Sequence, residues 1–131
     1  PFAHGLSYTA FEYRLEQRLR SGSCPGRACI TVSILNSGHR AGAEVVQLYL
    51  GFPPGLGEPL KVLRHFRKLQ LAPQQSKSID FSLSAHDLEI FDVVADRWTT
   101  PNGVYTLSIA SSSRDVRLVE TFAIENGAIK L

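Results

Sequence analysis

The sequence predicts an all-β fold, an antiparallel β-sandwich of about seven strands. Apolar and polar residues alternate with a period of two along several segments, the pattern of a strand with one face in a core and one face in water. Clusters of Gly, Pro, Asn and Ser separate these segments at short intervals, without intervening helices of about 10 to 15 residues. The length of 131 residues is that of one domain.

The first half of the chain contains four predicted strands. Residues 11–19 carry mostly apolar side chains at odd positions and charged ones at even positions. Leu and Glu would also suit a helix there, but the regular alternation favours a strand. A strand at 30–34 follows, then the turn residues 36–42, a β-rich segment at 43–52 and a strand at 62–71 that Pro73 ends.

The second half continues the pattern. Residues 78–83 alternate most clearly, and 84–88 are expected to form a short helical turn in which Ser84 accepts a backbone hydrogen bond. Strands are predicted at 105–110 and 116–124. Tyr105 follows a turn at the start of a late strand, where the tyrosine corner of an immunoglobulin-like or fibronectin type III-like sandwich lies.

Composition excludes several classes of protein. Hydrophobic residues make up 44% and charged residues 20%, as in an ordinary globular domain. A net charge of +2 demands no nucleic acid as partner, and no apolar run approaches the ~20 residues of a membrane span. The chain starts at Pro1 and contains no methionine, which indicates a segment of a longer protein.

Cys24 and Cys29 flank a Pro-Gly turn and are a candidate disulfide. Two reduced thiols at a strand end are the alternative. Metal binding is not expected because structural zinc normally has four ligands and no further ligand pair follows. A disulfide would suit the extracellular space or the secretory pathway, although this chain has no signal segment.

No group of residues forms a recognisable catalytic or cofactor site, so we predict no catalytic, cofactor or metal residues. Asp87, Glu89, Asp92 and Asp96 supply the carboxylates that glycoside hydrolysis needs, but their alternation with apolar residues favours a solvated face. The histidines are scattered, at positions 4, 39, 65 and 86.

Two groups of side chains suggest binding rather than catalysis. A basic stretch surrounds Phe66 and could meet phosphate or an acidic partner; it consists of Lys61, Arg64, Arg67 and Lys68. Aromatic side chains could stack on a sugar ring, although packing in the core or at its rim is the commoner role; they are Tyr8, Tyr49 and Trp98.

The opening residues 1–9 read P-F-A-H-G-L-S-Y-T. They resemble the P-F-G-H-G-L-S-Y-T junction that precedes the C-terminal fibronectin type III-like domain of glycoside hydrolase family 3 enzymes, the β-glucosidases and β-xylosidases. The resemblance covers nearly the whole chain. It continues through residues 42–49, 59–63, 66–68, 71–76, 87–88, 103–106 and 111–115.

The resemblance implies a junction segment at 1–10, a sandwich at 11–125 and a tail at 126–131. In that family the catalytic aspartate and glutamate belong to domains upstream of this one, and no position here corresponds to either. The chain is therefore expected to be a non-catalytic accessory domain that packs on the catalytic domains of its parent protein, with possible carbohydrate contact. An interaction or structural module recruited into a larger assembly is the alternative, and a free-standing enzyme is disfavoured.

Three positions depart from the family pattern. Ala3, His65 and Gln74 stand where the family usually has glycine. Such turn positions often require a positive φ, which glycine adopts without strain. These departures weaken the expectation that the parent protein is an active glycosidase.

Overall fold

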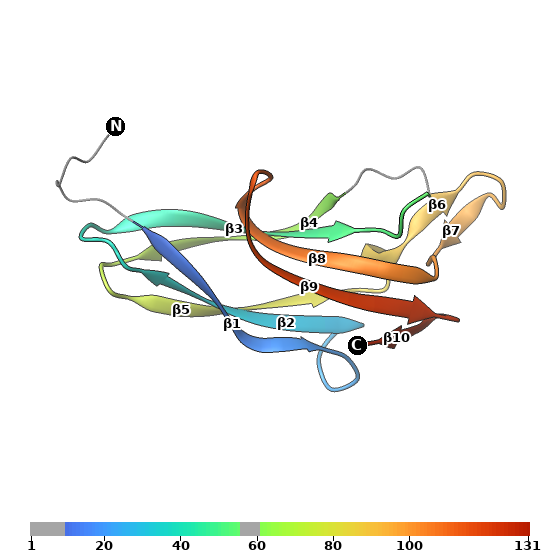
Figure 1. Cartoon of the computed structure of the whole chain (residues 1–131), viewed down its shortest axis with the longest axis horizontal. Helices are drawn as coiled ribbons and strands as arrows, with labels where there is room; N and C mark the ends of the chain where they lie inside the picture. Colours follow the sequence, from blue (N-terminus) through green and yellow to red (C-terminus); the bar gives the residue numbers. More distant parts are fainter. Residues whose placement is uncertain (1–9, 56–60) are drawn as a thin grey trace.

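The computed structural model describes residues 10–55 and 61–131, so residues 1–9 of the predicted junction lie outside the described part. Seven long strands confirm the predicted all-β fold (Figure 1). They are β1 (Phe11–Arg20), β2 (Ala28–Asn36), β3 (Gly42–Gly51), β4 (Val62–Leu71), β5 (Ser76–Leu83), β8 (Gly103–Ser112) and β9 (Asp115–Glu125). The short elements are a 3-10 helix η1 (His86–Leu88) and the strands β6 (Ile90–Asp92), β7 (Arg97–Thr99) and β10 (Ala128–Lys130).

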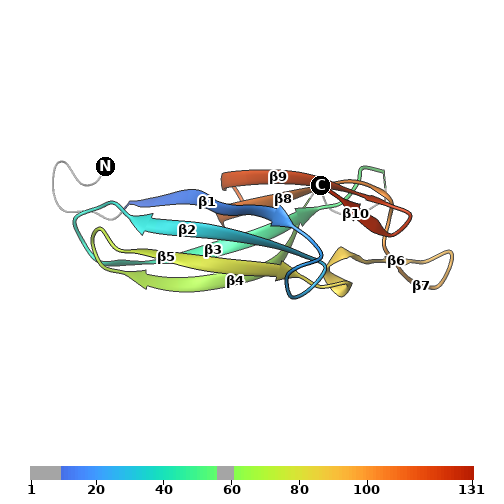
Figure 2. The same cartoon turned by 90° about the horizontal axis from the view of Figure 1, so that it is seen from below.

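The long strands form two sheets, and all recorded pairings are antiparallel. One sheet has the order β1-β2-β5 and the other β10-β9-β8-β3-β4. The hairpin β6–β7 stands apart from both and lies at the end of the sandwich opposite the start of β1 (Figures 1 and 2). Two packed antiparallel sheets with strands that cross between them are the architecture of an immunoglobulin-like or fibronectin type III-like sandwich.

The core lies between the two sheets and is filled by every second residue of the long strands. Most of these side chains are aliphatic and almost fully buried. The largest are Tyr105, Ile30, Ile34, Leu48, Leu50, Leu71, Ile79, Leu83, Leu88, Leu107, Ile109 and Ile124.

Tyr105 forms the predicted tyrosine corner. Its Oη donates a hydrogen bond to the carbonyl oxygen of Pro101 at 2.6 Å, while its ring stacks on Phe122 with the centroids 5.2 Å apart. Burial raises the pKa of Tyr105 to about 12, so the hydroxyl remains a donor at neutral pH. The corner fixes the turn before β8 to the core.

The helical turn predicted at 84–88 is also present. Ser84 Oγ accepts a hydrogen bond from the backbone N–H of Asp87 at 3.2 Å, and Leu88 is fully buried in the core. The turn therefore anchors the connection between β5 and the β6–β7 hairpin.

The structure differs from the sequence prediction at three places. The alternation of β1 breaks at Gln17, an odd position that is exposed, where the pairing with β2 shifts register; Leu19 is buried on the predicted face. Strands β6 and β7 were not predicted. Residues 126–131, expected as a tail, contain β10, because Asn126 (φ 52°) and Gly127 (φ 80°) form a tight turn that pairs it with β9.

Candidate functional site

A disulfide joins Cys24 to Cys29 and closes the loop between β1 and β2, with the two Cα atoms 6.3 Å apart. Gly26 lies in the left-handed region (φ 81°), and a Cβ atom there would lie 2.8 Å from the carbonyl oxygen of Leu83. Arg27 donates from its backbone N–H to Leu83 O at 2.7 Å and from Nη2 to Gly127 O at 2.8 Å. The loop thus contacts both the end of β5 and the turn before β10.

Three of the four acidic residues singled out in the sequence have separate partners, and Asp96 lies in the β6–β7 turn with a φ of 55°. Asp87 Oδ2 lies 2.8 Å from His65 Nε2, and Glu89 Oε1 lies 3.1 Å from His86 Nδ1. Asp92 Oδ1 accepts from two backbone N–H groups of the β6–β7 turn. Among the described residues, no hydrogen bond joins two of these carboxylates. Their contacts hold turns and surface segments and do not form the paired carboxyl groups of an acid–base catalyst.

Asp87 and His65 clamp η1 to the edge strand β4. Asp87 Oδ2 also accepts from the backbone N–H of Ser84 at 2.8 Å, and Arg64 Nε donates to the carbonyl oxygen of Asp87 at 3.0 Å. Partial burial opposes ionisation of Asp87, but the hydrogen bonds from His65 and Ser84 outweigh it and lower the pKa of the carboxyl group. The family glycine before Phe66 is thus replaced by a histidine that has a defined structural partner.

An aromatic cluster lies beside this clamp. The Trp98 ring is 5.1 Å from the His86 ring and 5.5 Å from the Phe91 ring, in edge-to-face arrangements. Trp98 and Phe91 are 53% and 41% exposed. An open cavity of about 510 Å³ adjoins the cluster, lined by Phe91, Asp92, Thr99, Asn102 and other residues of this end.

The basic stretch is largely engaged within the chain. Lys61 Nζ donates to Ser113 O at 2.9 Å and lies 5.0 Å from the centre of the Tyr49 ring. Arg64 contacts η1, as described, and the Arg67 guanidinium reaches the carbonyl oxygen of Asp80 on β5 at 3.4 Å. Intramolecular contacts thus engage Lys61, Arg64 and Arg67, whereas Lys68 is exposed on β4.

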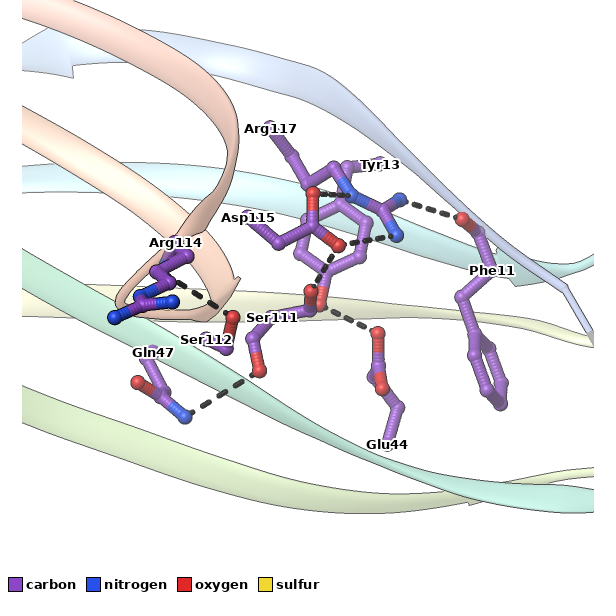
Figure 3. A network of polar contacts seen from close by, with 9 residues as sticks. All are labelled: Phe11, Tyr13, Glu44, Gln47, Ser111, Ser112, Arg114, Asp115 and Arg117. Atoms are coloured by element: carbon purple, nitrogen blue, oxygen red, sulfur yellow. Dashed lines mark hydrogen bonds and ion pairs between the residues drawn. The ribbon is translucent and has the colours of Figure 1, made fainter.

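The turn between β8 and β9 carries an extended polar network (Figure 3). Arg117 binds Asp115 through two hydrogen bonds of 2.9 and 3.1 Å and donates to the carbonyl oxygen of Phe11 at 2.8 Å. The Arg117 guanidinium also lies 4.8 Å from the centre of the Tyr13 ring, and Tyr13 Oη donates to Glu44 Oε2 at 2.8 Å.

This network joins β9 to β1 and β1 to β3, so it connects the two sheets at one open side of the sandwich (Figure 3). The hydrogen bond from Arg117, followed by that from Ser111, lowers the pKa of Asp115. Burial, together with the hydrogen bond to Glu44, raises the pKa of Tyr13. Asp115 is therefore held in its ionised form, which binds Arg117, and Tyr13 is held in its protonated form, which donates to Glu44. Both contacts indicate a structural role.

The sequence analysis identified only part of these residues. It noted the segment 111–115 through the family resemblance but did not expect Tyr13 and Glu44 to meet, because nothing local relates them. His4 and Tyr8 lie outside the described residues, whereas His39 is a described residue that has an interaction partner. In the described part of the chain no group of three or more His, Cys, Asp or Glu could hold a metal ion, and no helix there is long and apolar enough to cross a membrane.

Comparison with known proteins gives a consistent result. The family described as "Fibronectin type III-like domain" matches residues 44–113. The probable β-glucosidase L of Aspergillus fumigatus is 36% identical over 143 residues, which cover 96% of this chain and 19% of that protein.

Solved structures agree with the sequence matches. The β-glucosidase from Kluyveromyces marxianus in complex with glucose superimposes with a TM-score of 0.82 and 32% identity, over 96% of this chain and 15% of that one. The GH3 β-glucosidase of Bifidobacterium adolescentis gives a TM-score of 0.78 with 27% identity, over 94% and 18%. The chain spans about a fifth of the length of the curated relatives it matches.

The sheet order, the tyrosine corner and the match over residues 44–113 lead to one conclusion: the chain belongs to the family of fibronectin type III-like domains, in the form found within β-glucosidases of glycoside hydrolase family 3.

Proposed function

We propose that this chain is the non-catalytic accessory domain of a longer β-glucosidase-like hydrolase. The observation that carries the proposal is the coverage: 96% of the chain matches only 19% of a β-glucosidase, and the matched part is a sandwich. The titratable groups described above support it, since Asp87, Asp92 and Asp115 hold turns and strands together. Hydrolysis of β-glucosides belongs to the remainder of the longer protein.

The test separates the chain from its parent. The 131-residue chain and the full-length protein are assayed with an aryl β-glucoside at equal molar concentration. We expect turnover by the full-length protein and none by the chain alone. Turnover by the chain that survives repurification contradicts the non-catalytic role, and an inactive full-length protein contradicts the hydrolase parent.

The compartment follows from the disulfide. A Cys24–Cys29 bond persists in an oxidising environment, so we place the protein in the secretory pathway or outside the cell. Titration of free thiols in protein taken from its native source, alkylated at harvest, tests this. Two free thiols per chain contradict it.

The Trp98 cluster supports a carbohydrate contact as an additional role. Exposed aromatic rings stack on the C–H faces of sugars, and Asp92, Thr99 and Asn102 in the adjoining cavity offer hydrogen bonds to hydroxyl groups. Trp98 is the one tryptophan of the chain, so its fluorescence reports on the cluster directly. We expect glucose or cellobiose to change this emission, and Phe91→Ala to weaken the response; an emission unaffected by either sugar contradicts the contact.

A further inference from the structure

The two sheets of the sandwich present outer faces of opposite character. On β2 and β5 the core residues alternate with outward-facing Thr31, Ser33, Ser78 and Asp80. Three of these side chains are hydrogen-bonded on the face: Thr31 Oγ1 donates to Asp80 Oδ1 at 2.6 Å, and Ser78 donates to Glu16. The outer face of β1-β2-β5 is therefore the polar surface expected of a sheet in water.

The outer face of the larger sheet carries large exposed apolar side chains among polar ones. Strand register places Leu63, Tyr49, Ser108 and Val119 in one row across β4, β3, β8 and β9. The residues that precede Tyr49, Ser108 and Val119 in their strands lie in the core or pack against it; they are Leu48, Leu107 and Leu118. Because successive side chains of a strand point to opposite faces, the row points away from the core.

A second row runs parallel to the first through Phe66, Gln47, Ala110 and Val116. Val104 lies on the same side of β8, beyond a row formed by Gly51, Thr106 and Thr121. We call these two rows together with Val104 the outer apolar face.

Exposure confirms the contrast between the two faces. Ten large hydrophobic side chains are exposed among the described residues. Half of them lie on the outer apolar face, four lie on or between β6 and β7, one is the last residue, and the sheet β1-β2-β5 contributes none. The five on the outer apolar face are Leu63 (45%), Phe66 (59%), Val104 (59%), Val116 (39%) and Val119 (55%).

We infer that the outer apolar face is the surface by which this domain docks onto the remainder of its own longer polypeptide. This inference rests on the proposed function. Large exposed apolar side chains gathered on one side of a domain mark an interaction site. The relatives carry this domain in chains about five times as long, so a large body of protein is tethered next to it.

Charge specifies the chemistry of the partner surface and disfavours a second copy of the chain. Lys61, Lys68 and Lys130 lie around the outer apolar face together with Glu125, while Asp115, next to Val116, is already paired with Arg117. Two such faces in contact would bring like charges together, which costs free energy. The surface that fits is an apolar patch with carboxylates at its rim.

Thiol reactivity tests the inference. Single cysteines are introduced into the full-length protein at Val119 and Leu63, and as matched controls at Val94, an exposed valine of the β6–β7 turn, and at Ser76, which is exposed on β5. Cys24 and Cys29 are paired with each other and do not compete, and labelling of the full-length protein without an introduced cysteine is subtracted as background. Rates of maleimide labelling of the folded protein are divided by the rates in urea.

In the full-length protein we expect Val119→Cys and Leu63→Cys to label at least about tenfold more slowly than Val94→Cys and Ser76→Cys. In the 131-residue chain all four are expected to label at similar rates. Equal rates in the full-length protein overturn the inference. Protection in the short chain that grows with concentration indicates a second copy instead, and protection that requires added glucan indicates a polysaccharide surface.

The outcome is independent of catalysis. An active β-glucosidase in which Val119→Cys labels freely overturns the docking surface and leaves the proposed function intact. A protected cysteine in a full-length protein without glucosidase activity overturns the proposed function and leaves the docking surface intact.

Discussion

Among single residues, Gln74 has the backbone conformation that suits it least. It follows Pro73 in the turn between β4 and β5 with a φ of 66°. A residue with a Cβ atom costs ~1–2 kcal/mol in this left-handed region, whereas glycine adopts it freely. The family resemblance had glycine at this position, and the expectation of a positive φ is confirmed for Gln74 but not for His65, which lies in regular strand β4.

We therefore expect Gln74→Gly to stabilise the domain. The gain should be about 0.5–1 kcal/mol in the free energy of unfolding, because relief of strain exceeds the added entropy of the unfolded chain. Urea denaturation followed by circular dichroism measures it. Gln75→Gly is the control: Gln75 has no positive φ and its Oε1 accepts from Ala72 N at 2.7 Å, so that variant should be destabilised. Equal effects of the two substitutions contradict the explanation.

Tyr105 carries the second prediction at this scale. Tyr105→Phe keeps the stacking on Phe122 but leaves the carbonyl oxygen of Pro101 without the hydroxyl donor. Loss of a buried hydrogen bond should lower the free energy of unfolding by about 1–3 kcal/mol. Tyr49→Phe is the matched control, since the Tyr49 hydroxyl bonds to Gln47 on the outer side of the sheet. A Tyr105→Phe protein as stable as the Tyr49→Phe protein would show that the corner contributes little.

Between elements, the contact of His65 with Asp87 is the clamp that holds η1 on the edge of β4. The side chain of Asp87 is only 14% exposed, so its charge is better shielded from solvent than that of Glu89 in the neighbouring His86–Glu89 pair. The clamp also positions Leu88, which is fully buried. Its effect on stability should therefore exceed that of an ordinary surface pair.

We expect Asp87→Asn to destabilise the domain by about 1 kcal/mol at neutral pH, because it removes a charged acceptor of hydrogen bonds. The pKa of Asp87 lies below its ordinary value of 3.8, so its contribution is present above that pH and is lost as the pH falls through the lowered value. The difference between wild type and variant should accordingly shrink below about pH 3.8. Urea titrations at several pH values measure this difference, with Glu89→Gln as a control that changes little. A difference that stays constant down to pH 2 contradicts the role given to the Asp87 charge.

The same elements show what the sequence could predict. The bounds of β4 agree at both residues 62 and 71, because alternation and the Ala72-Pro73 turn are local signals. Strands β6 and β7 have three residues each, and within residues 10–55 and 61–131 they pair with one another alone. Strands of this length are too short for a period of two to be visible in the sequence. The β10 strand depends on pairing with β9, which the sequence of 128–130 alone does not encode.

For the whole molecule, the sequence predicted the layers but not their pairing. Gln47 lies beside Ala110 because β3 and β8 are neighbours, and Tyr13 meets Glu44 across the two sheets. Both relations join segments far apart in the chain. The outer apolar face is visible only after the register of four strands is known, whereas the sequence taken alone assigned Phe66 to a basic stretch.

The disulfide loop affects the molecule as a whole because it contacts segments of both sheets. It joins β1 to β2, its Arg27 binds Leu83 of β5 and Gly127 before β10, and Cys29 is 2% exposed. Closing so short a loop restricts the unfolded chain and stabilises the fold by about 2 kcal/mol.

We expect reduction with dithiothreitol to lower the free energy of unfolding by ~2 kcal/mol. Unfolding should remain a single transition, because the two sheets share one core. The measurement is urea denaturation with and without reductant, with free thiols counted to prove reduction. A Cys24→Ala, Cys29→Ala double variant is the control, and its stability should not respond to the reductant. No loss of stability in the wild type once both thiols are free contradicts the prediction. The contacts of Arg27 and Gly26 would then be sufficient to hold the loop without the covalent bond.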